Sequence, residues 1–228
     1  MFQRSRPHEL QIGKGDEISG MAEILGIAAF DLDGTLLRGR TVCEILAEPL
    51  GRGDEMRRFE TGSTQEEIVE ARIAMAVWYR ERDLRELQTY LCHACWAPRA
   101  QEGIAQLQDA GVEVAILSVT WGFAVRYLAA QLNVQHCLGT ELLPNGEIEH
   151  CWGQTKADFL GRLMRQLQIP AERVAAIGDS SGDIPMLELA GLRFFIGKIR
   201  PEIPDALHVP GADIRTIADK ILETWSHK

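Results

Sequence analysis

Mostly apolar runs of strand length alternate with helical patterns along the second half of the chain. The clearest runs lie at residues 112–117 and 173–177, and they have the length of buried strands. Further strands are predicted at 24–30, 134–139 and 192–196, and helices at 98–110, 122–132, 154–168, 182–190 and 213–225. Repeated strand and helix units of this kind indicate a parallel sheet that is covered by helices on both faces.

Two stretches depart from this alternation. Residues 141–150 are predicted to form a hairpin, because Pro144-Asn145-Gly146 stands between two short arms that contain apolar residues. Residues 38–95 carry helical patterns and no predicted strand, with helices expected at 41–50, from a Thr64 cap onward, and from Asp83 to about residue 96.

The expected fold class is therefore α/β, with a doubly wound, Rossmann-like parallel sheet and a small helical domain inserted after the first strand. The core is assigned to residues 21–37 and 96–228, and the helical insertion to 38–95. Residues 1–20 are polar and aperiodic, which predicts a flexible N-terminal extension.

Charge and cysteine content narrow the class of partner. The formal net charge is −9, which argues against nucleic acid or an anionic membrane as the main partner. The longest apolar runs are strand-sized, so no membrane-spanning helix is expected. Five cysteines without a secretion signal favour a reducing, cytoplasmic location. Monomer and homodimer both remain open.

The pair Cys92 and Cys95 has the spacing of half a zinc site, with His93 between them. The sequence has no second pair of Cys or His residues at metal-ligand spacing that could complete such a site. Because the segment carries a helical pattern, packing of small apolar thiols is the favoured interpretation.

Candidate chemistry begins at Asp31-Leu32-Asp33-Gly34-Thr35, directly after the first strand. Side chains alternate along a strand, so Asp31 and Asp33 start on the same side. Two like charges so close together require a positive partner, and hard oxygen ligands favour Mg²⁺. A simple turn is the alternative. A calcium loop is excluded, because Leu36 and Leu37 occupy positions where further oxygen ligands are needed.

A second acidic cluster follows the strand at 173–177 and contains Asp179 and Asp183. Asp183 stands at a helix start and Asp179 in a turn, so capping and turn formation explain them without a metal. Acids at the ends of two strands of one sheet nevertheless favour a shared metal site.

A hydroxyl and an ammonium complete the candidate chemistry. Ser118 ends the strand at 112–117, where its hydroxyl and the following backbone N–H of Val119 suit a phosphoryl oxygen. Lys156 stands in the first turn of a helix, where acids are usual. Lys156 either neutralises a bound anion or is simply exposed to solvent. Ser118 either binds a phosphoryl oxygen or caps the following helix.

These motifs, in this order and each after a strand, resemble the haloacid dehalogenase superfamily of aspartyl phosphotransferases. The helical insertion and the hairpin are similar to the cap and hairpin of its phosphoserine-phosphatase-like branch. The resemblance implies that Asp31 is the nucleophile and Asp33 the general acid and base. It implies that Ser118 and Lys156 hold the phosphoryl group, and that Mg²⁺ is bound by Asp31, the Asp33 main-chain carbonyl and Asp179, with Asp183 in support.

Departures from that branch concern the substrate. The branch places an acid that grips the substrate amine where this chain has Arg40, with Glu44 the nearest acid. Its carboxylate-binding arginine corresponds best to Arg72, and Gly182 replaces a usual Asn. We expect a Mg²⁺-dependent hydrolase of small phosphomonoesters, with phosphoserine the leading named substrate. A bulkier substrate or one without the amino acid head group, a phosphomutase or phosphotransferase, and a catalytically silent phosphate-binding regulatory module are the alternatives.

Overall fold

The computed structural model describes residues 24–62, 64–80, 82–199 and 202–227. The N-terminal extension predicted at 1–20 lies outside these residues. Within the described part of the chain, no helix is both long enough and apolar enough to cross a bilayer.

A seven-stranded sheet forms the core in the order β4-β3-β2-β1-β5-β6-β7. The strands are β1 (Gly26–Phe30), β2 (Val112–Trp121), β3 (His136–Leu142), β4 (Ile148–Glu149), β5 (Val174–Gly178), β6 (Leu192–Phe195) and β7 (Leu207–His208). All neighbours pair in parallel except β3 and β4, which form the predicted hairpin. The α/β class and the parallel, doubly wound core are thereby confirmed.

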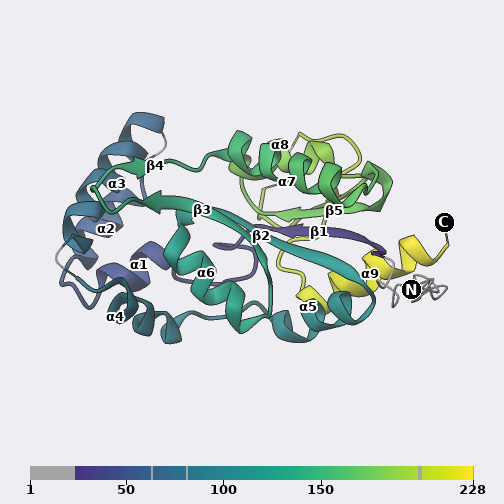
Figure 1. The fold of residues 1–228 in the computed structure, drawn as a ribbon, viewed down its shortest axis with the longest axis horizontal. Coiled ribbons are helices and arrows are strands. Elements are labelled where there is room, and N and C mark those ends of the chain that lie inside the picture. Colours follow the sequence, from purple (N-terminus) through teal and green to yellow (C-terminus); the bar gives the residue numbers. More distant parts are fainter. Residues whose placement is uncertain (1–23, 63, 81, 200–201, 228) are drawn as a thin grey trace, which may run out of the picture.

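Helices cover both faces of this sheet (Figure 1). The core helices are α5 (Ala100–Asp109), α6 (Gly122–Gln131), α7 (Gly153–Leu167), α8 (Ile184–Leu189) and α9 (Ile214–Ser226), with short 3₁₀ turns η2 (Ala171–Arg173) and η3 (Ser181–Asp183). Alternate residues of β1 serve the two faces: Ala28 and Phe30 pack in the cluster with α5, α6 and α9, while Ile27 and Ala29 pack against α7 and α8. A strand buried on both sides is therefore apolar throughout, which is the pattern of Gly26–Phe30.

The helical insertion lies at one end of the sheet (Figure 1). It contains α1 (Val42–Ala47), α2 (Gly53–Phe59), α3 (Gln65–Tyr79), α4 (Leu84–Thr89) and the 3₁₀ turn η1 (Tyr90–His93). Capping boxes begin two of these helices, at Thr41 with Glu44 and at Thr64 with Glu67. We propose residues 38–95 as the cap domain.

The two linkers that join this cap to the core are bonded to each other. The backbone N–H of Arg38 donates to the carbonyl of Cys95 over 2.8 Å, and the N–H of Ala97 donates to the carbonyl of Leu36 over 2.8 Å. Leu37 and Trp96 form an antiparallel bridge between these bonds. The chain therefore leaves the core and returns to it at one place.

Some elements differ from the sequence predictions. Strand β2 continues to Trp121, four residues beyond the predicted end at 117, so Ser118 lies in extended backbone rather than after the strand. Helix α2 was not predicted, because Gly51 and Gly53 indicate a loop; Gly53 is in fact the first helical residue. The short strand β7 also had no clear pattern.

The packing interpretation of Cys92 and Cys95 is wrong. The helix that begins after Asp83 ends at Thr89 and continues only as the turn η1, so both thiols are exposed. A zinc site is not supported either, since the one possible metal-binding group found among the described residues lies elsewhere.

Candidate active site

Asp31 is the first residue after β1, the central strand of the sheet. Its backbone N–H donates to the carbonyl of Ile177 over 2.9 Å, which fixes it beside the end of β5. Its side chain is buried, and one carboxylate oxygen lies 2.6 Å from Nζ of Lys156, 125 residues later in the chain. Parallel strands thus bring the first acidic motif to the same sheet edge as the second.

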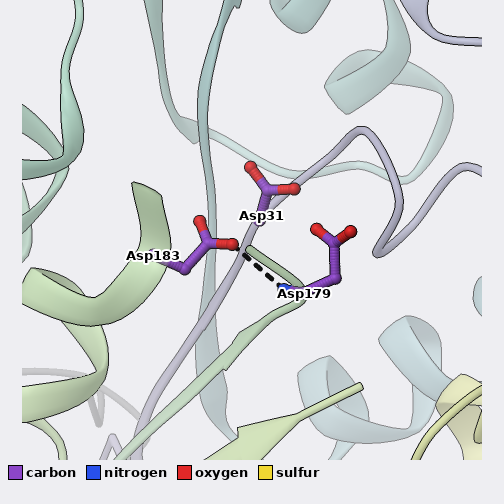
Figure 2. Close-up of side chains that lie close together, drawn as sticks. All are labelled: Asp31, Asp179 and Asp183. Atoms are coloured by element: carbon purple, nitrogen blue, oxygen red, sulfur yellow. Dashed lines mark hydrogen bonds between the residues drawn. The ribbon is translucent and has the colours of Figure 1, made fainter. Parts of the chain in front are cut away.

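Three carboxylates gather at this edge. Ligand oxygens of Asp31, Asp179 and Asp183 all lie within 4.8 Å of one another. Figure 2 shows the carboxyl groups of Asp31 and Asp179 pointing to the same side, with Asp183 bonded to the backbone of Asp179. Lys156 donates to Asp183 over 2.7 Å as well as to Asp31, so one ammonium bridges two of the acids.

Both carboxylate oxygens of Asp183 accept hydrogen bonds from the protein. One oxygen accepts from the backbone N–H groups of Asp179 and Ser180, each over 3.0 Å, and from the Ser180 hydroxyl over 3.1 Å. The other oxygen accepts from Lys156. Asp183 therefore shapes the loop that presents Asp179, which leaves Asp31 and Asp179 with more free lone pairs for a metal ion.

Gly34 makes room for this arrangement. Its φ of +82° lies in the left-handed region, and a Cβ atom built there would stand 2.2 Å from a carboxylate oxygen of Asp179. Thr35 is buried beside it, with its hydroxyl 3.4 Å from the other oxygen of Asp179. The turn after Asp33 thus packs directly on the second acidic loop.

The charges of the site are strongly perturbed. Burial raises the pKa of Asp31, and Asp183 raises it further against the opposing effect of Lys156. Burial and the neighbouring Asp183 raise the pKa of Asp179 to about 6. Burial alone would lower the pKa of Lys156, but Asp31 and Asp183 outweigh it and the pKa is raised. A single ammonium does not neutralise three acids, and the oxygen donor set suits a hard divalent cation.

Asp33 faces the cap instead of this cluster. One of its carboxylate oxygens accepts the backbone N–H of Val42 over 2.8 Å, at the start of α1. Burial raises its pKa to about 7, partly offset by the Val42 bond, while the charge of Glu60 raises it further. A carboxyl group with this pKa is present in both protonation states near neutral pH, which suits an acid that later acts as a base.

Ser118 and Lys156 are each only 1% exposed. Phe30 aligns with Ile116 on β2, so Ser118 stands near Asp31 on the neighbouring strand. Its hydroxyl accepts the backbone N–H of Thr120 over 3.3 Å. Val119 follows Ser118 within β2, and its carbonyl accepts hydrogen bonds from Arg72 and Thr140.

Solvent reaches the site beside Asp179. A cavity of about 830 Å³ opens there, lined by Gly34, Arg38, Ser180 and the segment around Gly197 and Lys198. Asp179 is half-buried while Asp31 is almost fully covered. The Asp179 side of the cluster is therefore the more accessible one.

The predicted cap residues are placed very differently from one another. Arg40 is exposed and forms an ion pair with Glu48. Glu44 accepts the backbone N–H of Thr41 over 2.8 Å in the capping box of α1. Arg72 is buried against the core, where it donates to the carbonyl of Val119 over 2.8 Å. The structure thus brings Arg72, but not Arg40, into contact with the end of β2.

Sequence reasoning missed several neighbours of the site. Thr35 was part of the first motif and its proximity to Asp179 was accessible from that pattern. Thr140 and Glu60 carried no local signal. Thr140 bonds to the carbonyl of Val119 from β3. Glu60, at the C-cap of α2, accepts the hydroxyl of Thr41 over 2.8 Å, and its charge raises the pKa of Asp33.

The three clustered acids and Lys156 all lie in the part of the chain that matches a known protein family. A profile of the haloacid dehalogenase-like hydrolase family matches residues 28–188. A phosphoserine phosphatase of Idiomarina loihiensis is 32% identical over 184 residues, covering 73% of this chain and 80% of that protein. A phosphoserine phosphatase of Archaeoglobus fulgidus is 28% identical over 178 residues, which are 73% of this chain, and the chain spans 51% of that relative's length.

Among solved structures, a substrate-bound phosphoserine phosphatase complex gives a TM-score of 0.71 at 19% identity, covering 86% of this chain and 97% of that one. At that identity the likeness shows the fold. All site residues between Asp31 and Asp183 fall within the region that the family profile matches.

Proposed function

Because the chain belongs to the haloacid dehalogenase-like hydrolase family, in its phosphoserine-phosphatase-like branch, we propose that it hydrolyses small phosphomonoesters through an aspartyl-phosphate. The observation that carries this proposal is the buried carboxylate of Asp31, bonded to Lys156 and grouped with Asp179 and Asp183. A carboxylate attacks a phosphate dianion only where positive charge offsets their repulsion; Lys156 supplies part of that charge, and a divalent cation held by the acids would supply the rest.

Asp31 and Asp33 divide the chemistry between them in this proposal. An oxygen of Asp31 attacks phosphorus, and the bond from phosphorus to the leaving oxygen breaks. Asp33 gives its proton to that oxygen, which releases an alcohol. Asp33 then takes a proton from the water that attacks the aspartyl-phosphate, so inorganic phosphate leaves and both carboxyl groups return to their starting states. The pKa of about 7 at Asp33 supports both roles near neutral pH.

Ser118, the N–H of Val119 and Lys156 hold the phosphoryl oxygens in this scheme. The ammonium of Lys156 already lies 2.6 Å from the attacking carboxylate, so it can offset charge on both reactants. Ser118 and Lys156 are buried, so solvent would screen their interactions with a phosphoryl oxygen only weakly.

The donor set fits Mg²⁺. Asp31 and Asp179 would hold the ion, together with the main-chain carbonyl of Asp33, while Asp183 keeps the Asp179 loop in place. When bound, Mg²⁺ supplies positive charge that stabilises the transferring phosphoryl group. Burial, together with the neighbouring charge of Asp183, raises the pKa values of Asp31 and Asp179, and a bound divalent cation would favour the ionised form of both.

Phosphoserine is the leading named substrate, because relatives bear that name. The exposed position of Arg40 and the core contacts of Arg72 support a substrate range beyond phosphoserine. Free thiols at all five cysteines support a reducing, cytoplasmic location.

The test is phosphate release from a panel of phosphomonoesters, with Mg²⁺ or with a chelator and without any acceptor alcohol. We expect Mg²⁺-dependent release in the wild type and none with Asp31→Asn. Transfer that occurs only when an acceptor is added would favour a phosphotransferase. Binding of a phosphate mimic without any turnover would favour a regulatory module.

A further inference from the structure

Arg72 belongs to cap helix α3, yet its side chain is buried against the core and the residue is only 5% exposed. Its Nη2 donates to the carbonyls of Val119 over 2.8 Å and Cys151 over 3.1 Å, and its Nη1 lies 3.0 Å from Nδ1 of His150. The guanidinium carbon stands 4.5 Å from the centre of the Trp152 ring. All of these partners belong to the core, so one cap side chain ties the two parts together.

The contacted segments directly precede or follow the proposed phosphoryl-binding groups. Val119 comes immediately after Ser118 on β2. Trp152 is the N-cap of α7, and its carbonyl accepts the backbone N–H of Lys156 over 3.1 Å. A shift of either segment would therefore move Ser118 or Lys156 relative to Asp31.

Thr140, on β3, completes the same connection. Its hydroxyl donates to the carbonyl of Val119 over 2.8 Å and accepts the backbone N–H of Cys151 over 3.1 Å. Thr140 is 1% exposed, so these bonds are shielded from water. The carbonyl of Val119 thus receives one hydrogen bond from the core and one from the cap residue Arg72.

The guanidinium is also largely occupied. Three of its N–H groups have acceptors in the core, and one ring face covers it. Burial lowers the pKa of Arg72, and no carboxylate forms an ion pair with it within the described ranges. Backbone carbonyls are therefore what satisfies this buried cation.

On the basis of the phosphomonoester hydrolase proposed above, we propose that Arg72 is a positioning residue that couples seating of the cap to the alignment of Ser118 and Lys156. In this role Arg72 does not recognise a carboxylate of the substrate. The enzyme is then open to phosphate esters without a carboxylate, because its buried cap arginine serves the phosphoryl site common to all substrates.

The experiment compares Arg72→Met and Arg72→Lys on phosphoserine and phosphoethanolamine, which share phosphate and amine but differ in the carboxylate. We expect kcat to fall by a similar factor on both substrates, on the order of 10²-fold for Arg72→Met, since small misplacement of reacting groups has effects of this size. Arg72→Lys should recover part of the loss. The exposed Arg58, changed to Met, is the matched control and should leave both activities unchanged.

A loss confined to phosphoserine would overturn the proposal, because it would identify Arg72 as a carboxylate-binding residue. Affinity for orthovanadate in the presence of Mg²⁺ is the second measurement, since this phosphate mimic has no carboxylate. Both Arg72 variants should bind orthovanadate more weakly than the wild type, and unchanged affinity would also overturn the proposal.

Orthovanadate binding separates this inference from the proposed function. If the wild type binds orthovanadate but hydrolyses no phosphomonoester, the proposed hydrolase function is refuted. The orthovanadate affinities of the Arg72 variants would still test the positioning role of Arg72. Wild-type protein that neither binds nor hydrolyses would refute both. If the Arg72 variants do not fold, Thr140→Val removes the second bond to Val119 at nearly constant volume. It should weaken orthovanadate binding and lower kcat on both substrates; unchanged values would contradict the proposal.

Discussion

The carboxylate of Asp33 accepts the backbone N–H of Val42 over 2.8 Å, so the proposed general acid is held by the first residue of cap helix α1. Asp31, two residues earlier, is held by Lys156 of the core. The two carboxylates of one motif are therefore fixed by different parts of the molecule. The proton donor is bonded directly to the cap, whereas the nucleophile is bonded to a core residue.

Asp33→Asn should separate substrates by their leaving group. Loss of the proton donor should lower kcat on phosphoserine by about 10²–10⁴-fold. Aspartyl-phosphate formation from p-nitrophenyl phosphate should be much less affected, because nitrophenolate leaves without a proton. Rapid-quench measurement of the nitrophenolate burst checks this, and equal losses of the first step on both substrates would argue against Asp33 as the acid.

Mg²⁺ should stabilise the protein more at pH 7.5 than at pH 5.5. The pKa of Asp179 is raised from 3.8 to about 6 in the folded state, so the folded state binds more protons than the unfolded state between these values. The contribution of Asp179 to the free energy of unfolding of the metal-free protein therefore falls as the pH rises from about 4 to about 6. Mg²⁺ competes with the proton, so its effect on Tm should grow as Asp179 ionises. Thermal unfolding with and without Mg²⁺ at both pH values measures the difference; an equal Mg²⁺ shift would contradict the assignment.

Lys156→Met should abolish turnover and destabilise the fold. It removes the buried ammonium that pairs with Asp31 and Asp183, and breaking a buried pair typically costs about 3–5 kcal/mol. Lys220 is exposed and makes only a 4.0 Å contact with Glu223, so Lys220→Met is a suitable control with an expected effect below about 0.5 kcal/mol. Urea unfolding at pH 7 compares the two variants. Equal stabilities would show that the acids do not depend on Lys156 for their balance.

Gly34→Ala and Gly39→Ala form a matched pair of backbone tests. Both glycines have φ near +80°, at +82° and +84°, so an alanine adds similar backbone strain at each. A Cβ at Gly34 would stand 2.2 Å from Asp179, whereas nothing lies within 4 Å at Gly39. We expect Gly34→Ala to raise the Mg²⁺ concentration for half-maximal activity by tenfold or more, and Gly39→Ala to change it little. If the activities of both variants depend on Mg²⁺ concentration in a similar way, the close approach of Gly34 to Asp179 does not affect metal binding.

The sequence was informative wherever chemistry follows from the end of a strand. Asp31, Asp179 and Asp183 could be brought together on paper because parallel strands end at one edge. The positions of Arg40 and Arg72 could not, since both depend on how α1 and α3 pack rather than on their own helical patterns. Arg40 turns outward to Glu48, while Arg72 turns inward to carbonyls that lie 47 and 79 residues away. Side chains that satisfy backbone groups at such separations leave no periodic signal.

The paired linkers between cap and core have a further consequence. The backbone N–H of Ala97 donates a 2.8 Å hydrogen bond to the carbonyl of Leu36. If the residues between Leu36 and Ala97 were deleted, the two new chain ends would therefore lie next to each other. A short turn can close that gap at small entropic cost, because closure entropy changes slowly with loop length. The insertion can therefore be replaced as a unit: a different lid can be inserted between the same two positions without a change in the strand order of the sheet. Exchange of the insertion offers a way to alter substrate choice on an unchanged sheet, provided that the new lid again bonds Asp33 and the carbonyl of Val119.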